Sequence, residues 1–346
     1  RAKVNEGAAI NVPEAKFSQM ARAVIPHIQI GVIKDPGSGL YMVPAAALRY
    51  YVYANESCFQ MLLLDRLGYH DLVSDYLETF IRLQGSKPLP GDFSGDQKAV
   101  YYGACVDRVY DYTATGYNLH HGTVLWMMGQ HYLLSNDREW LGHAAASMRQ
   151  AADWIIAQRK QTKNDDFYRH LAPGLLPSGR LEDNREWGQW FSVNAYAWLG
   201  LDATARALQR AGMDGSAYYR QQADDYLQDL RTAITVASER APVVRLRDRT
   251  FAPFLPTRAG QRYRGFDRKL DYFNRYDPTI KPMLRLSATR ELLYGPMILL
   301  NTGVIQPNEP LADWILDDWE DNLTLSSSLG LRSEERRVGK ECRSRW

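Results

Sequence analysis

The fold class is indicated most clearly by residues 117–160, YNLHHGTVLWMMGQHYLLSNDREWLGHAAASMRQAADWIIAQRK. Its first part, residues 117–134, contains no Asp, Glu, Lys or Arg, and its second part, residues 137–160, contains seven of them. The second part also carries an apolar stripe at helical spacing, made of Trp140, Ala144, Met148, Ala151 and Ile155. A helix that is apolar all round is buried on several sides, whereas a helix with one apolar face lies on the outside. We therefore predict a hairpin of one inner and one outer helix.

The same pair of helices recurs along the chain. Residues 46–67 and 70–84 form one predicted pair, and residues 189–211 and 215–238 form another, so that first helices begin about 71 residues apart. A further pair is predicted at residues 286–301 and 310–321, and residues 13–33 form a single helix before the first pair. Repeated helical hairpins form a solenoid or a closed toroid. We predict an all-α protein, an (α/α)6 toroid of which about four and a half hairpins are present.

The connections between pairs are long, whereas those within pairs are short. Residues 85–116, 161–188 and 239–285 each lead into an inner helix, so these connections gather on one face of the toroid. Long connections in a compact domain are usually functional. In the 240–285 loop, the segments VVRL from Val243 and TFAPFL from Thr250 predict a small β-hairpin insertion.

Composition and charge exclude several classes of protein. Of 346 residues, 45% are hydrophobic and 12% aromatic, which excludes a disordered chain. No apolar run is long enough to cross a membrane. Residues 332–346 (RSEERRVGKECRSRW) have no structural period, and we interpret them as a non-native tail translated from a sequencing adapter. Residues 1–331 are then a fragment of one catalytic domain.

The tail also accounts for the basic balance of the chain. Without its six basic and three acidic residues, the 42 Lys and Arg become 36 and the 40 Asp and Glu become 37, a net charge of −1. A nucleic-acid partner is therefore not expected. The 240–285 loop still holds twelve Lys and Arg against four Asp. It either recognises an anionic glycan or pairs with acidic residues elsewhere in the chain.

The most informative motif is GLLPSGRLEDNREWGQW, residues 174–190, which leads into an inner helix. It places Glu182, Asp183 and Glu186 beside Trp187 and Trp190, and these two tryptophans are candidate substrate-binding residues. Glycoside hydrolysis needs one carboxylic acid to protonate the leaving oxygen and a second carboxylate across the sugar ring. Indole rings desolvate a neighbouring acid and raise its pKa. The alternative is that Glu182 or Asp183 caps the following helix.

A second motif, DRVYDYTATGYNLHH, ends at residue 121 and also enters an inner helix. Its candidate substrate-binding residues are Tyr112, Tyr117, Asn118, His120 and His121, which can stack on a sugar and form hydrogen bonds with it. Adjacent histidines face different ways on a helix, so we predict no metal site and no cofactor. The alternative is that Thr115 caps the helix and that one histidine belongs to the core.

Two carboxylates on predicted helices complete the candidates. Glu320 lies in the motif DDWEDN on a late hairpin, from which a base could face the acid of the middle loop. The alternative for Glu320 is a solvated helix end. Glu56 lies within an inner helix, where a buried carboxylate would need a partner or a role.

The sequence resembles the six-hairpin glycosidases, the (α/α)6-barrel group of glucoamylases, trehalases and α-rhamnosidases. The resemblance rests on the helical hairpins, on the aromatic residues where loops enter inner helices, and on the motif LLPSGRLEDNREWGQWFSVNAYAWLG. The resemblance covers roughly residues 13–330. It implies a carbohydrate substrate, no metal, an acid in the loop before a middle inner helix, a base on a late hairpin, and inversion of configuration. It therefore points to Glu182, Asp183 or Glu186 as the acid and to Glu320, or a residue beyond Leu331, as the base.

Two other functions fit the same residues. A toroidal polysaccharide lyase would use Tyr117 with His120 or His121 to abstract a proton from a uronate sugar. A non-catalytic helical-repeat module would use the aromatic face for binding, although repeat modules have shorter and more regular loops. The sequence assigns neither a cellular compartment nor an oligomeric state.

Overall fold

The computed structural model describes residues 7–8, 10–45, 51–103, 112–114, 116–181, 187–262 and 295–324. Its helices are α1 (Ala15–Gly31), α2 (Ala54–Arg66), α3 (His70–Arg82), α4 (Leu119–Ser135), α5 (Arg138–Asn164), α6 (Asp166–Arg169), α7 (Phe191–Ala211), α8 (Ser216–Glu239), α10 (Met297–Asn301) and α11 (Pro310–Asp318), followed by the π-helical turn η4 (Trp319–Thr324). Three two-stranded antiparallel hairpins join them: β1 (Ile33–Lys34) with β2 (Tyr41–Met42), β3 (Gly179–Arg180) with β4 (Trp187–Gly188), and β5 (Val243–Arg245) with β6 (Phe251–Pro253). The protein is all-α, as predicted.

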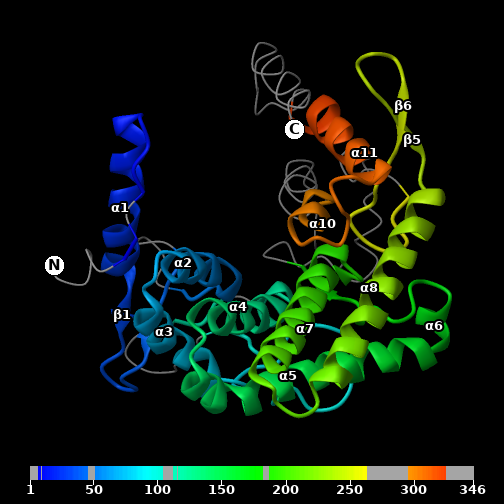
Figure 1. The fold of residues 1–346 in the computed structure, drawn as a ribbon. Coiled ribbons are helices and arrows are strands. Elements are labelled where there is room, and N and C mark those ends of the chain that lie inside the picture. The colour runs from blue at the N-terminus through cyan, green and yellow to red at the C-terminus, as the bar shows by residue number, and fades with distance from the viewer. Residues whose placement is uncertain are drawn as a thin grey trace.

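The helices form two layers of a toroid. The inner helices α2, α4 and α7 pack side by side, and α3, α5 and α8 cover them from outside (Figure 1). Glycines bring α4 and α7 together, because a Cβ atom on Gly122 would lie 2.5 Å from the backbone nitrogen of Ala197. A Cβ atom on Gly129 would lie 2.6 Å from that of Ala203. Any larger side chain at these two positions would force the inner layer apart.

The outer helix α5 confirms the pattern seen in the sequence. All five residues of its predicted apolar stripe are buried, from Trp140 to Ile155. The Asp137 side chain accepts hydrogen bonds from the backbone amides of Glu139 and Trp140 at 2.9 Å each, which fixes the start of the helix.

Short turns join the helices of each pair, and residues with positive φ make those turns possible. Gly68 between α2 and α3 has φ 88°, Asn136 between α4 and α5 has φ 55°, and Gly212 after α7 has φ 67°. Glycine and asparagine adopt this conformation with little strain. The breaks therefore fall where the sequence predicts them.

Several boundaries differ from those predicted. Helix α2 begins at Ala54 rather than at residue 46: residues 51–53 are not helical, Tyr53 is extended, and residues 46–50 lie outside the described part. The described part of the predicted helix 286–301 is helical from Met297. The β5–β6 hairpin in the 240–285 loop was predicted, whereas the other two hairpins were not.

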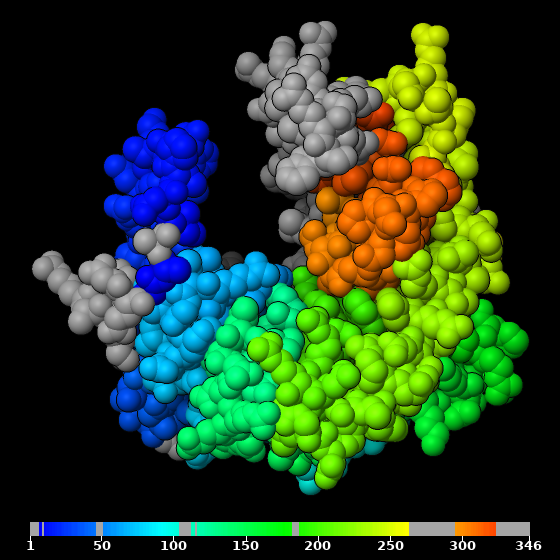
Figure 2. Space-filling view, in the orientation of Figure 1, coloured from blue at the N-terminus to red at the C-terminus, as the bar shows by residue number. Residues whose placement is uncertain are grey.

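The described elements comprise four helical hairpins and the single helix α1, as predicted. They form an arc with α1 at one end and α10 and α11 at the other (Figure 1). The surface is hollowed between α1 and α10 (Figure 2). Within the described residues, no helix combines the length and the hydropathy that crossing a membrane requires. Residues 332–346, the predicted non-native tail, lie outside the described part.

Candidate functional site

Backbone hydrogen bonds join the long connections into one layer, next to the N-termini of α4 and α7. Gly91, from the connection before α4, forms an antiparallel bridge with Gly179 of β3. Trp190 at the start of α7 forms another with Arg258, which follows β6. The backbone amide of Phe191 donates to the carbonyl of Thr257 at 3.0 Å. Three segments that are far apart in the sequence thus build one surface, as the lengths of the connections suggested.

The acidic motif lies between strands β3 and β4. Glu182, Asp183 and Glu186 lie outside the described residues, but the residues on both sides of them are described. Arg180 pairs with Trp187 across the hairpin, and Leu181 is fully buried. The chain segment that carries the three acids is therefore held at both of its ends.

The two tryptophans of this motif have different environments. The Trp187 indole, which is half-buried, donates to Asp92 Oδ2 at 3.2 Å. Trp190 is buried, donates to the carbonyl of Gly179 at 3.1 Å, and lies under the guanidinium of Arg258. Trp187 is thus accessible to a ligand, whereas Trp190 is buried and stabilises the β3–β4 hairpin through its hydrogen bond to Gly179.

Four rings gather next to this hairpin, at the N-termini of α2 and α4. The ring centroids of Tyr53 and Tyr117 are 5.2 Å apart, and that of His120 lies 5.1 Å from Tyr117. The ring of Tyr102 stands edge-on to His120 at 6.3 Å, and its hydroxyl donates to the carbonyl of Ala114. Tyr53 and Tyr102 are absent from the sequence-based candidates, although Tyr53 precedes α2 much as Tyr117 precedes α4.

The adjacent histidines face opposite ways, as expected. His120 lies within 2.6 Å of the carbonyl of Tyr102, so its Nδ1 carries the hydrogen and donates it. Its Nε2 is then an acceptor, and this buried atom has no hydrogen-bond partner among the described residues. Burial lowers the pKa of His120 to about 4, against the opposing effect of its hydrogen bond to Tyr102. His120 is therefore neutral at pH 7.

His121 belongs to the core between α4 and α5. The backbone amide of Tyr101 donates to its Nδ1 at 3.1 Å, so its Nε2–H donates to the carbonyl of Ala151 at 3.2 Å. Its ring packs edge-on against Trp154 at 4.8 Å. Burial also lowers the pKa of His121 to about 4. This arrangement matches the alternative in which one histidine is structural.

Asn118 joins α4 to both long connections. Its Nδ2 donates to the carbonyl of Pro90 at 3.2 Å, while its buried Oδ1 has no hydrogen-bond partner among the described residues. Gly179 of β3 packs so closely that a Cβ atom there would overlap Asn118 Nδ2. Tyr112 is buried as well, and its carbonyl accepts from the amide of Val52 at 3.0 Å, next to Tyr53.

The remaining two carboxylates lie apart from this cluster in the sequence. Glu320 is half-buried in η4, beside Asp321, which accepts from the amide of Arg247 at 2.9 Å. This contact holds η4 against the β5–β6 hairpin (Figure 1). Glu56 is exposed in the first turn of α2, so the expectation that it is buried is wrong. The reason is that α2 begins eight residues later than predicted.

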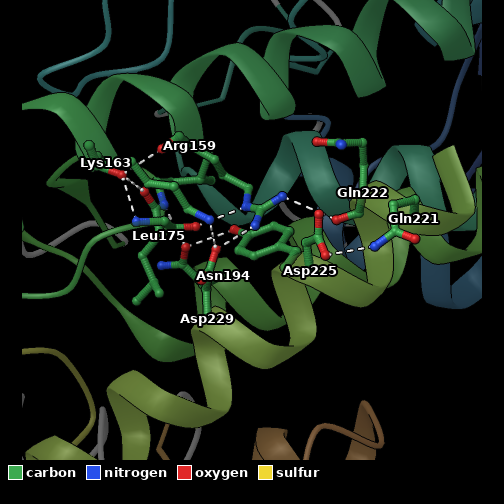
Figure 3. Close-up of polar contacts among 12 residues, drawn as sticks. Arg159, Lys163, Leu175, Asn194, Gln221, Gln222, Asp225 and Asp229 are labelled. Atoms are coloured by element: carbon green, nitrogen blue, oxygen red, sulfur yellow. Dashed lines mark hydrogen bonds and ion pairs between the residues drawn. The ribbon is translucent and has the colours of Figure 1, made fainter. Parts of the chain in front are cut away.

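A buried polar network anchors the segment that carries the β3–β4 hairpin, and sequence analysis missed it (Figure 3). Asn194 of α7 accepts hydrogen bonds from the amide of Leu176 and the hydroxyl of Tyr226, both at 2.7 Å, and donates to the carbonyl of Trp190. Arg159 of α5 donates to the carbonyl of Gly174 at 2.8 Å and pairs with Asp229. These bonds fix the chain on both sides of the hairpin.

The comparisons with known proteins agree with this fold. No protein-family model matches the chain, and no curated protein matches its sequence. The solved structure of a wild-type glycosidase is 14% identical, with a TM-score of 0.51, and the match covers 88% of this chain and 70% of that one. A glycosidase variant with a glutamate replaced by alanine gives the same values. The chain thus has the all-α toroidal fold of these glycosidases.

Proposed function

We propose that the protein is a glycoside hydrolase that cleaves an oligosaccharide or polysaccharide by carboxylate acid/base catalysis. Asn118 Oδ1 and His120 Nε2 carry the proposal, because they are two buried acceptors without a partner among the described residues. His120 packs against the paired rings of Tyr53 and Tyr117, and Asn118 follows Tyr117 in the chain. A buried acceptor without a donor is costly. A sugar supplies hydroxyl donors for such acceptors and an apolar C–H face for the rings.

The β3–β4 hairpin supplies the catalytic acid in this proposal. Glu182, Asp183 and Glu186 are the candidates, since the strands on either side of them are anchored next to Asn118. Glu320 is the candidate base, because a base on a second segment can activate a water across the sugar ring. With this division of roles the reaction inverts the anomeric configuration. The similarity in fold to two solved glycosidases supports the proposal.

One observation also favours a lyase as the second candidate. Tyr117 and His120 lie together, and His120 offers an unpartnered lone pair at Nε2, as proton abstraction from a uronate requires. Its low pKa makes His120 a weak base, however. We therefore assign His120 to substrate hydroxyl binding and place the lyase second. A non-catalytic module remains the third candidate, and it would bind glycans without releasing products.

The products of the reaction distinguish the three candidates. The full chain would be incubated with neutral and uronate-containing glycans, while new reducing ends and the absorbance of unsaturated uronate are recorded together. Hydrolysis gives reducing ends without absorbance, and a lyase gives both signals. Bound glycan without either signal would overturn the enzymatic proposal. For a hydrolase, NMR of the first product then tests inversion, because the anomeric proton of the nascent sugar reveals its configuration before mutarotation.

A further inference from the structure

A second polar cluster lies at the opposite end of the inner helices, on the face with the short turns. It consists of Asp65 near the end of α2, His70 at the start of α3, and His131 in the last turns of α4. Nδ1 of His70 is 2.8 Å from Asp65 Oδ1, and Nδ1 of His131 is 2.9 Å from both oxygens of that carboxylate. One candidate ligand atom from each of the three residues lies within 4.8 Å of the other two.

A positive charge would stabilise this buried cluster. The side chains of Asp65 and His131 are fully buried, and that of His70 is 35% exposed. A buried carboxylate is costly unless a cation accompanies it. Among the described residues, the ion-pair partners of Asp65 are His70 and His131, which are charged only when protonated. A bound ion would bring the positive charge that neither Lys nor Arg supplies in these pairs.

The distances allow a metal ion after a small movement. Ligands in the tetrahedral geometry of zinc, with bonds of about 2.05 Å, lie about 3.3 Å from each other, so the carboxylate and each Nδ1, now within hydrogen-bonding distance, would move apart by about 0.5 Å. Nε2 of His131 lies 2.9 Å from Ser74 Oγ, a partner of the kind that orients a metal-binding histidine. The ring of Trp140 packs edge-on against His131 at 4.4 Å and restricts its rotation.

We propose that Asp65, His70 and His131 bind one divalent transition-metal ion, with zinc as the ion that best fits two imidazoles and one carboxylate. The exposed edge of His70 gives the ion its way into the cluster and leaves room for water as a further ligand. The ion neutralises Asp65 and joins the ends of three helices. Residues that are neighbours in the sequence do not indicate this site, because its ligands come from three helices.

Zinc titration of the full chain tests this proposal. Protein stripped with EDTA and dialysed would be titrated with zinc chloride by calorimetry, and thermal unfolding would be recorded with and without zinc. We expect one zinc per chain and a higher Tm with zinc. His70→Ala keeps the buried Asp65–His131 pair, and we expect it to weaken zinc binding at least 10-fold. Ser74→Ala, which removes only the partner of His131, should weaken it roughly 10-fold.

His143 provides the matched control. It is exposed and lies 2.7 Å from Glu78, so it forms a histidine–carboxylate pair like those of Asp65, but it belongs to no three-ligand group among the described residues. His143→Ala should leave zinc affinity and stoichiometry unchanged. The proposal is wrong if the wild-type chain shows no saturable zinc binding. It is also wrong if His70→Ala and Ser74→Ala, both shown to be folded by circular dichroism, bind zinc as tightly as the wild type.

Discussion

Acid should destabilise this protein through His120 and His121. Both rings are buried and their pKa values are lowered to about 4, from an ordinary value of 6.5. Because the folded state binds these protons less readily than the unfolded state, protonation favours unfolding. The free energy of unfolding is therefore highest above about pH 6.5, and it decreases for each of these histidines as the pH falls from there towards 4.

The size of the effect follows from these pKa values. At pH 5 an exposed histidine is mostly protonated, whereas a group with a pKa of about 4 is mostly neutral. The free energy of unfolding should then fall by about 2 kcal/mol for each histidine between pH 7 and pH 5, or about 4 kcal/mol for the pair. A loss of this size is a large part of the stability of a typical domain.

Urea unfolding at pH 7, 6 and 5, followed by circular dichroism, measures this loss. His121→Leu removes one of the two groups, so the variant should be less stable at pH 7 but lose only about half as much stability on acidification. Gly142→Ala, at an open helical position, changes no titratable group and should lose as much stability as the wild type on acidification. If His121→Leu and the wild type lose equal stability between pH 7 and pH 5, His121 is not buried in its neutral form.

Four substitutions test the site and the helices that hold it. Gly179→Ala should abolish glycan cleavage without unfolding the protein, because its Cβ overlaps Asn118, whereas Gly142→Ala in an open helical position should stabilise the fold by about 0.5–1 kcal/mol. Cleavage assays and thermal unfolding check both variants. Asn194→Ala leaves the buried amide of Leu176 and the hydroxyl of Tyr226 without their partner and should cost about 2–4 kcal/mol in urea unfolding. Asp137→Ala removes the cap of α5 and should cost about 1 kcal/mol in the same assay.

The helices could be predicted from the sequence because their signals are local. In α5 the apolar stripe, the capping Asp137 and the turn at Asn136 all lie within the helix or next to it. The start of α2 was missed, since the apolar residues before Ala54 continue the helical pattern although residues 51–53 are not helical. Hydrophobic periodicity cannot distinguish these two conformations over a few residues.

The candidate site could be predicted only in part. Motifs next to the inner helices identified Tyr117, Asn118 and His120, which the fold brings together. The contributions of Tyr53 and Tyr102 depend on the pairing of segments that are distant in the sequence, for which a single sequence carries no signal. For the same reason, the sequence could not show whether His120 or His121 faces Tyr117.

Loss of hydrolysis on removal of a carboxylate in the β3–β4 hairpin would test the central claim most directly. The rate of reducing-end release would be measured for the wild type and for Glu182→Gln, Asp183→Asn and Glu186→Gln. Asp166→Asn serves as the control, because Asp166 precedes the hairpin in the same connection and its side chain is 92% exposed. We predict that one hairpin variant loses at least 100-fold in rate while the control is unaffected. Full activity in all three hairpin variants would contradict the assignment of the acid.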